Sequence, residues 1–354
     1  MALMAIDHSS KAFNAGRVVT DSFFTYRPGS PLPAAQFLTR FMTHLCAPTF
    51  LFLAGTGLAF TVDRQIAKGE NPWTIDRSIA TRGLVIAAFE LWISWFTQPP
   101  HTWMLQVLYA IGIGFLFMVP LRRLPTRAAL GLALALLVGG EVMMRIGMGS
   151  DRSRAPLLVA LLVVGGERPP FIISYPVIHW LAILLFGWVW GKMLVSKKPS
   201  TEQIVRQLAG WGLGALVTFA LLRAANGYGN MLLYREGHSL VQWLHVSKYP
   251  PSIAYTTLEL GIMALILAAL FLVSQMRAPQ SGGLLATLGQ TPMFFYLLHY
   301  PLLITASRLA GVEHQLGLLA TYAGAASVIA LLYPVCRWYR PFKATGRHAW
   351  TRYV

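Results

Sequence analysis

Histidine and carboxylate side chains inside apolar stretches are the first candidates for chemistry in this sequence. His8 follows Asp7 near the start of the chain, and His44 begins a long apolar run. The unperturbed pKa of histidine, near 6.5, suits proton removal at neutral pH. We predict that His44 or His8 acts as general base for attack on a thioester carbonyl, with Asp7 orienting an imidazole. The alternative is that both are polar helix ends that meet water at the outer leaflet.

Other ionisable residues fall in the middle of apolar runs, where an insertion cost of about 2.5–3.5 kcal/mol calls for a reason. They are Glu90, Glu259 and His299. One interpretation makes them interhelical hydrogen-bonding groups. Another makes them a proton relay or a solute site in a transporter.

Some polar residues have a structural explanation. Glu141 and Arg145 stand at i and i+4, the spacing at which opposite charges on a helix neutralise each other. We interpret His101 and His179 as packing or interface residues, and Ala54–Gly57 as a helix-packing contact. Cys46 and Cys336 lie far apart inside apolar runs, so the sequence predicts neither a disulfide framework nor a metal site.

The composition places most of the chain in a membrane. Of its 354 residues, 55% are hydrophobic and only 12% are charged, about half the charged share of a soluble domain. Apolar runs long enough to cross a bilayer recur throughout, and in lipid such runs must be helical. They are expected at about 43–63, 80–97, 103–121, 128–147, 173–195, 207–223, 252–275, 283–308 and 316–337. The sequence therefore predicts an all-α, polytopic membrane bundle of about ten helices, forming one domain over 1–354.

The first of these ten helices is short. Met1–Ile6 is an apolar segment too short to cross a bilayer, and it has neither the basic region nor the cleavage site of a signal peptide. We expect it to be the second half of a helix that a late start codon truncates, or an interfacial segment.

Positive charge orients the bundle. Lys and Arg gather in the linkers that follow alternate spans and in the tail, which assigns that side to the cytoplasm. Among them are Arg77, Arg82, Arg122 and Arg123. The net charge of +16 is therefore explained by topology rather than by nucleic acid.

Several motifs resemble one known family. They are 4–8 (Met-Ala-Ile-Asp-His), 37–55, 108–112, Tyr175-Pro176, 248–252 (Lys-Tyr-Pro-Pro-Ser), 289–301 and 333–337. In this order they resemble the heparan-α-glucosaminide N-acetyltransferase-like family of transmembrane acyltransferases, in particular its bacterial branch of uncharacterised membrane proteins.

The resemblance implies a pore-like site that acetyl-CoA reaches from the cytoplasm. It also implies an acceptor, a sugar by resemblance alone, on the far side. Arg40, Tyr296, His299 and Lys248 would then bind substrate, although Arg40 could equally anchor a lipid headgroup. The four arginines named above would meet the phosphates of the CoA donor. The expected partners are acyl-CoA, a glycan-like acceptor and lipid, in a bacterial inner membrane, with no metal; a homodimer stays open.

One departure affects the catalytic assignment. The family's lysosomal enzyme uses a His in the outside loop before its second main helix, and 9–40 holds none here. The family's Asp-x-Leu-Arg-Gly stretch before Asp-His is also missing. Either His8 or His44 has taken over the base function, or the chemistry differs. A proton-coupled transporter and a non-catalytic scaffold remain the rival functions.

Overall fold

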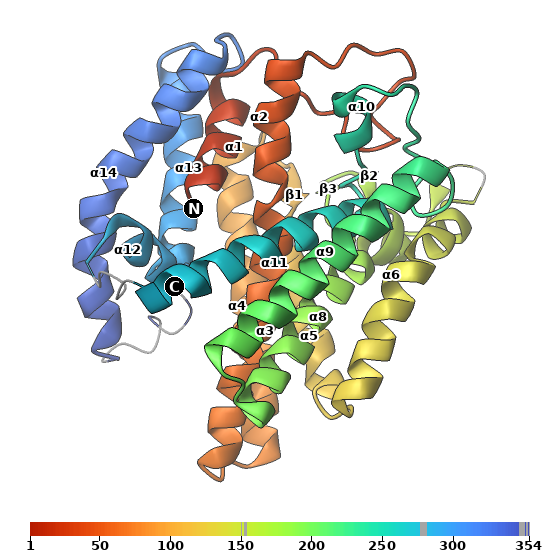
Figure 1. The fold of residues 1–354 in the computed structure, drawn as a ribbon. Coiled ribbons are helices and arrows are strands. Elements are labelled where there is room, and N and C mark those ends of the chain that lie inside the picture. The colour runs from red at the N-terminus through yellow and green to blue at the C-terminus, as the bar shows by residue number, and fades with distance from the viewer. Residues whose placement is uncertain (150, 152–153, 277–281, 347–350, 352, 354) are drawn as a thin grey trace.

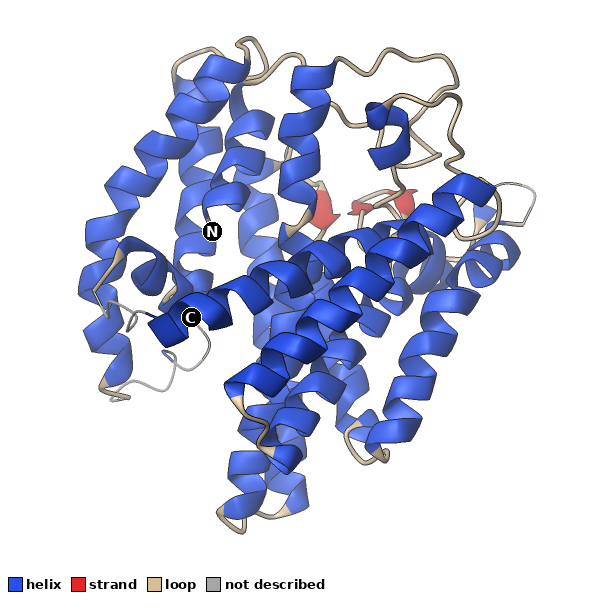
Figure 2. Ribbon diagram, in the orientation of Figure 1, coloured by secondary structure: helices blue, strands red, loops and turns tan. Residues whose placement is uncertain are grey.

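The computed structural model describes the chain except at 150, 152–153, 277–281, 347–350, 352 and 354. Helices dominate it (Figures 1 and 2). The helices of the first half are α1 (Ala2–Phe13), α2 (Ala34–His44), α3 (Cys46–Ala67), α4 (Pro72–Thr97), α5 (Val107–Leu121), α6 (Thr126–Met148) and α7 (Leu157–Val159), with one π-helical turn at Ala160–Val164. Those of the second half are α8 (Val177–Lys197), α9 (Thr201–Ala225), α10 (Leu240–Leu244), α11 (Ile253–Met276), α12 (Leu284–Gln290), α13 (Pro292–Leu309) and α14 (Leu318–Ala344).

Within the described part of the chain, seven helical stretches are long and apolar enough to cross a bilayer, and they confirm a polytopic helical membrane protein. The loops 68–71, 122–125 and 198–200 lie at one end of the bundle, which we call the basic end (Figure 1). The loops 14–33, 226–239 and 310–317 lie at the opposite end, called the loop end. The charge pattern assigns the basic end to the cytoplasm.

The first full span is longer than predicted. The sequence predicts it at 43–63, but Ala34–Ala67 forms one stretch of 34 residues. Leu45 joins α2 to α3 with helical dihedrals, so the chain continues as a helix through His44. Pro48 has no N–H to bond the His44 carbonyl. The Tyr255 hydroxyl donates to that oxygen instead, at 3.0 Å, which ties α11 to the α2–α3 junction.

Two predicted spans begin too early. The structure places strands at β1 (Trp103–Leu105) and β3 (Phe171–Ile173), where the sequence predicts the starts of helices. Together with β2 (Gly166–Arg168) they form a three-stranded sheet in the order β1-β3-β2. Gln106 and Pro176 separate β1 and β3 from α5 and α8. Irregular backbone is tolerated at membrane depth where protein covers it.

Glycine sets the closest helix packing. A Cβ on Gly55 of α3 would collide with the backbone of α8 at Leu184, and one on Gly187 would collide with Phe52. The Thr56 hydroxyl donates to the Gly187 carbonyl at 3.0 Å. The predicted packing role of 54–57 is thus confirmed at Gly55. A Cβ added to Gly57 would meet no described atom within 4 Å, so Gly57 makes no such close contact.

Candidate active site

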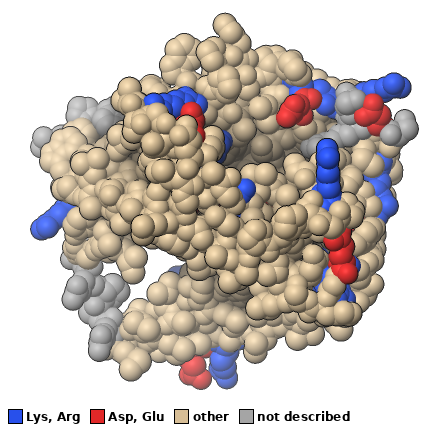
Figure 3. Space-filling model, turned by 90° about the horizontal axis from the view of Figure 1, so that it is seen from above, with Lys and Arg blue, Asp and Glu red and all other residues tan. Residues whose placement is uncertain are grey.

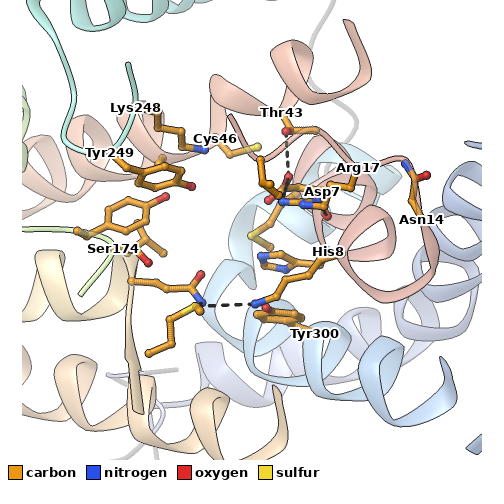
Figure 4. A pocket seen from close by; sticks show the side chains of 18 of the residues that line it. Asp7, His8, Asn14, Arg17, Thr43, Cys46, Ser174, Lys248, Tyr249 and Tyr300 are labelled. Atoms are coloured by element: carbon orange, nitrogen blue, oxygen red, sulfur yellow. Dashed lines mark hydrogen bonds and ion pairs between the residues drawn. The ribbon is translucent and has the colours of Figure 1, made fainter. Parts of the chain in front are cut away.

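A cavity of about 530 Å³ opens beside α1 near the loop end, and we call it the outer cavity. Its polar wall comes from α1, the α2–α3 junction, the β1 and β3 connections, the turn after α10, and α13. The main lining side chains are Asp7, His8, Lys11, Arg17, Thr43, Cys46, Gln106, Ser174, Tyr175, Lys248, Tyr249, Tyr296, Tyr300 and His314. In Figure 4, His8 and Tyr300 lie on one side of this cavity, and Tyr249 and Lys248 lie on the other.

His8 is held by a second histidine. Its Nδ1 lies 2.8 Å from Nε2 of His299 on α13, and Nδ1 of His299 lies 2.7 Å from the Phe295 carbonyl oxygen. Because a carbonyl only accepts, Nδ1 of His299 carries its proton, and in a neutral ring Nε2 is then the acceptor. Nδ1 of His8 therefore donates to His299, and Nε2 of His8 keeps a free lone pair. The chain thus presents a neutral imidazole base in the wall of a cavity.

The ring of His8 is also fixed by packing. It stacks on Tyr300 with ring centroids 3.8 Å apart and meets Tyr296 edge-on at 5.7 Å. His8 is 7% exposed and His299 fully buried. An imidazole held on several sides keeps one rotamer, which is what general base catalysis requires.

Asp7 faces away from the imidazoles. Its carboxylate accepts from Arg17 at 2.9 Å, from Arg40 at 2.5 Å and from Thr43 at 3.1 Å. No described hydrogen bond joins it to His8, although the sequence led us to expect Asp7 to orient a ring. Consecutive residues on a helix point about 100° apart, so the two side chains diverge. His299 orients His8 instead.

Arg40 bridges the partly exposed carboxylate of Asp7 and the buried carboxylate of Asp21. Besides Asp7 it bonds Asp21 through Nη2 at 2.6 Å and Nε at 3.1 Å. Burial alone would raise the pKa of the Asp21 carboxyl, but Arg40 and the hydrogen bond to His44 hold that pKa well below its usual range. Arg40 is only 7% exposed, so it is no headgroup anchor. It fixes the 14–33 loop to α1 and α2.

His44 lies behind this ion-pair cluster. Its Nε2 is 3.0 Å from Asp21, its side chain is almost fully buried, and it does not line the outer cavity. Nδ1 of His44 has no hydrogen-bond partner. Asp21 and Arg40 link His44 to Asp7, but no described hydrogen bond continues from Asp7 to His8. Of the two candidate bases, only His8 lines the cavity.

A tight turn presents Lys248 to the cavity. The Lys248 N–H donates to the Asp21 carbonyl at 2.8 Å, and Ser22 donates to the Tyr249 carbonyl, which fastens the turn to the 14–33 loop. Lys248 is 3% exposed, and its ammonium lies 5.3 Å from the centre of the Tyr249 ring. Within the described part of the chain, no carboxylate forms an ion pair with it.

A second cavity of about 520 Å³ lies toward the basic end, and we call it the inner cavity. Its wall is mainly apolar, with Leu53, Ile86, Ile111, Phe115 and Leu288 among its residues. Two basic side chains, Arg82 and Lys343, also line it. This cavity combines an apolar interior with positive charge.

Only one of the four predicted donor arginines lines that cavity. Arg82 does, whereas Arg122 and Arg123 both bond Asp76, the former at 2.7 Å. Arg77 is exposed on α4 and is not part of the lining. Lys343 is the second cation of the inner cavity, in place of the other three arginines. Because Lys343 and Arg82 are far apart in the sequence, no spacing predicts that they line the same cavity.

Glu141 and Glu90 have structural roles. Glu141 bonds Arg145 at 2.7 Å, as their spacing predicts, and accepts from the Gly229 N–H at 2.8 Å. Glu90 accepts from the Tyr109 N–H at 3.0 Å and so caps the start of α5. Among the described residues, no hydrogen bond joins Glu90, Glu259 or His299 to another of the three. The described residues therefore show no direct hydrogen-bonded relay among these three, which is the arrangement that the transporter hypothesis predicts.

Two further histidines lie outside the candidate site. His179 lies 2.8 Å from the Val163 carbonyl, and His101 is exposed in a turn. No three described His, Cys, Asp or Glu side chains are grouped to hold a metal ion.

Several residues that line the outer cavity are not predicted from the sequence. Lys11 stands three residues after His8 on the same face of α1, and that spacing could have identified it. Its ammonium lies 5.4 Å from the centre of the Tyr300 ring. Tyr249 and His314 come from loops, and no helical periodicity could have assigned them to the cavity.

Comparison with known families identifies the chain. A family model described as "Heparan-alpha-glucosaminide N-acetyltransferase, catalytic" matches residues 19–222, more than half of the sequence. The chain belongs to this family. This heparan-α-glucosaminide N-acetyltransferase-like protein is thus a multi-pass membrane enzyme of the acetyltransferase type. No curated protein matches it. The family match includes Arg40 and His44, whereas His8, Lys248 and His299 lie outside it.

Proposed function

We propose that the protein transfers an acetyl or similar acyl group from cytoplasmic acyl-CoA to an acceptor at the loop end, in a bacterial inner membrane. The acceptor is an amine or hydroxyl on a sugar. The observation that carries the proposal is the neutral imidazole of His8 in the outer cavity, with its proton fixed on Nδ1 by His299.

The two cavities suggest where the substrates bind. The inner cavity, near the cytoplasmic end, offers apolar walls to pantetheine and two cations, Arg82 and Lys343, to phosphate. The outer cavity offers polar side chains to the acceptor. Lys248, whose ammonium has no described ion pair, is suited to an anionic substituent on that acceptor.

The proposed reaction balances around His8. Nε2 of His8 takes the proton of the acceptor amine or hydroxyl as its nitrogen or oxygen attacks the thioester carbonyl carbon. A C–N or C–O bond forms, and the tetrahedral intermediate then expels the CoA sulfur with the electrons of the broken C–S bond. The proton on His8 passes to that thiolate, which leaves as free CoA, and His8 returns to its neutral form.

The test is turnover by protein purified into lipid nanodiscs, with acetyl-CoA as donor, glucosamine as probe acceptor and release of free CoA thiol as the signal. His8→Gln should lower turnover by about 10²–10⁴-fold, the usual contribution of a general base, while the thermal unfolding temperature changes little. His44→Gln is the matched variant, because His44 does not reach the cavity.

The outcomes separate the hypotheses. Full turnover in His8→Gln together with loss in His44→Gln would assign the base to His44. If both variants keep wild-type turnover, neither imidazole is the base and the proposed mechanism is wrong. If the wild type releases no CoA with glucosamine, the assay is repeated with labelled acetyl-CoA and cell-envelope extract, and absence of label transfer there would refute the acyltransferase function.

A further inference from the structure

Three side chains stand between the two cavities. Phe50 of α3, Val107 at the start of α5 and Tyr296 of α13 are the residues that line both of them. We call this set the neck. His8 lines the outer cavity and the two cations line the inner cavity, so a group that moves directly from the inner cavity to His8 would pass these three shared side chains.

The neck lies next to the proposed base. The Tyr296 ring meets the rings of His8 and His299 edge-on, with centroids 5.7 and 5.8 Å away. A donor that enters from the inner cavity therefore presents its acyl end to the neck first, followed by the carbonyl carbon and the sulfur. The acyl group has to pass the neck before the acceptor that His8 deprotonates can attack the thioester carbonyl.

The walls of the neck are held in place. Val107 is 8% exposed, and Glu90 pins the first turn of its helix through the Tyr109 N–H. Tyr296 is 5% exposed and packs edge-on against the imidazoles of His8 and His299. Close-packed walls of this kind resist even one added methyl group.

The hydroxyl of Tyr296 is a second, independent indication. It is buried and has no hydrogen-bond partner among the residues that the structure describes. Buried hydroxyls normally have a partner, so an unpaired one calls for an explanation. A thioester carbonyl oxygen that reaches the neck is an acceptor, and it would provide the missing partner.

We propose that Phe50, Val107 and Tyr296 select the acyl group by its width, so that straight, slender acyl groups pass and groups branched next to the carbonyl do not. This inference rests on the proposed acyl transfer and adds a substrate preference to it. One carbon more or less in a fitted apolar site changes specificity by about 10–200-fold. We therefore expect acetyl and propionyl thioesters to outperform isobutyryl thioester by at least tenfold.

The experiment compares acyl-CoA donors of equal carbon number. Wild-type protein in nanodiscs is given butyryl-CoA or isobutyryl-CoA, with acetyl-CoA as reference, and free CoA is measured with glucosamine as probe acceptor. Butyryl-CoA and isobutyryl-CoA have the same mass and charge, so the ratio of their kcat/KM values reports the effect of the width of the acyl group alone. In Val107→Ala, which widens the neck by two methyl groups, the ratio of isobutyryl to butyryl should rise about tenfold.

Two further variants complete the test. Phe50→Leu opens the same neck from α3 and should raise the same ratio, which covers the case that Val107→Ala fails to fold. Leu108→Ala is the matched control, because Leu108 is adjacent in sequence but lines the inner cavity alone. It should leave the ratio unchanged.

Failure of this inference differs from failure of the proposed function. If the wild type uses acetyl-CoA but accepts isobutyryl as readily as butyryl, or if neither neck variant changes the ratio, the neck is not the filter. If no thioester of the series is turned over and no label reaches an envelope acceptor, the acyltransferase proposal falls, and the neck proposal falls with it.

Discussion

His8 donates the hydrogen on its Nδ1 to Nε2 of His299 across 2.8 Å, although 291 positions separate the two residues in the chain. The pair joins α1 to α13 and decides which nitrogen of His8 is free. A histidine on its own exchanges between two neutral tautomers, whereas this one is held in a single form by a partner that is itself fixed by the Phe295 carbonyl.

Replacing His299 should therefore impair turnover without removing the base. In His299→Phe, the His8 ring loses its acceptor, and we expect kcat to fall at least tenfold while KM for acetyl-CoA stays within twofold. His299→Gln keeps an acceptor oxygen near the same place and should recover part of the loss. Steady-state kinetics of the two variants check this, and equal losses in both would argue against a tautomer role.

Donor affinity should depend on the two cations of the inner cavity. Arg82→Ala and Lys343→Ala each remove a charge that we assign to CoA phosphate, so each should raise KM for acetyl-CoA severalfold with little change in kcat. Arg77→Ala, on the exposed face of the same helix as Arg82, is the control and should behave as wild type. Acetyl-pantetheine has no phosphate, and its KM should be insensitive to all three changes.

Arg40 should be the largest single contributor to the stability of the loop end. Arg40→Met leaves the carboxylates of Asp7 and Asp21 without their shared guanidinium, and breaking the buried Arg40–Asp21 pair in this way costs about 3–5 kcal/mol. Arg17→Met should cost less, because Asp7 keeps Arg40 and Arg17 contacts no second carboxylate. Thermal unfolding in nanodiscs measures both. Equal unfolding temperatures for the two variants would contradict the bridging role.

His245 should make stability sensitive to mild acid. It lies outside the spans, where Nε2 donates to the Thr20 carbonyl at 2.8 Å, and burial lowers the pKa of His245 against the opposing effect of that bond. Asp21, Arg223 and Glu236 are the charged groups that act on it.

The sign of the effect follows from where the proton binds. The unfolded chain binds a proton on His245 near pH 6.5, whereas the folded chain binds it only at lower pH. The contribution of neutral His245 to the free energy of unfolding is therefore complete above about pH 6.5, and it declines as the pH falls toward the lower pKa of the folded state. The unfolding temperature of the wild type between pH 7.5 and 5 should therefore fall more steeply than that of His245→Gln. Parallel curves for the two proteins would exclude this role.

Much of the fold follows from the sequence because lipid permits few alternatives. Apolar length predicts the spans, and charge predicts which loops share an end. The errors occur where protein rather than lipid surrounds the backbone. Trp103–Leu105 and Phe171–Ile173 are apolar enough to extend a helix, but they pair as strands, a contact between segments about seventy residues apart.

The candidate site, like the fold, could be predicted from the sequence only in part. The sequence pointed to Asp7, His8 and His44 because each is polar at the edge of an apolar run. It could not show that His44 faces Asp21 while His8 faces the cavity, since that depends on the rotation of α1 and α2 about their axes. Nor could it join His8 to His299, because their helices lie at opposite ends of the chain.

The arrangement of two cavities has an electrical consequence. If the outer cavity opens at the loop end and the inner cavity at the basic end, as the proposed function requires, the layer between the two compartments is thinnest at Phe50, Val107 and Tyr296. The membrane voltage, about 2.3 kcal/mol per elementary charge at 100 mV, would then fall mainly over that short distance. An acetyl group is neutral and crosses the field without electrical work, whereas an ion would bear nearly all of it. Acyl traffic through this protein should therefore generate no current.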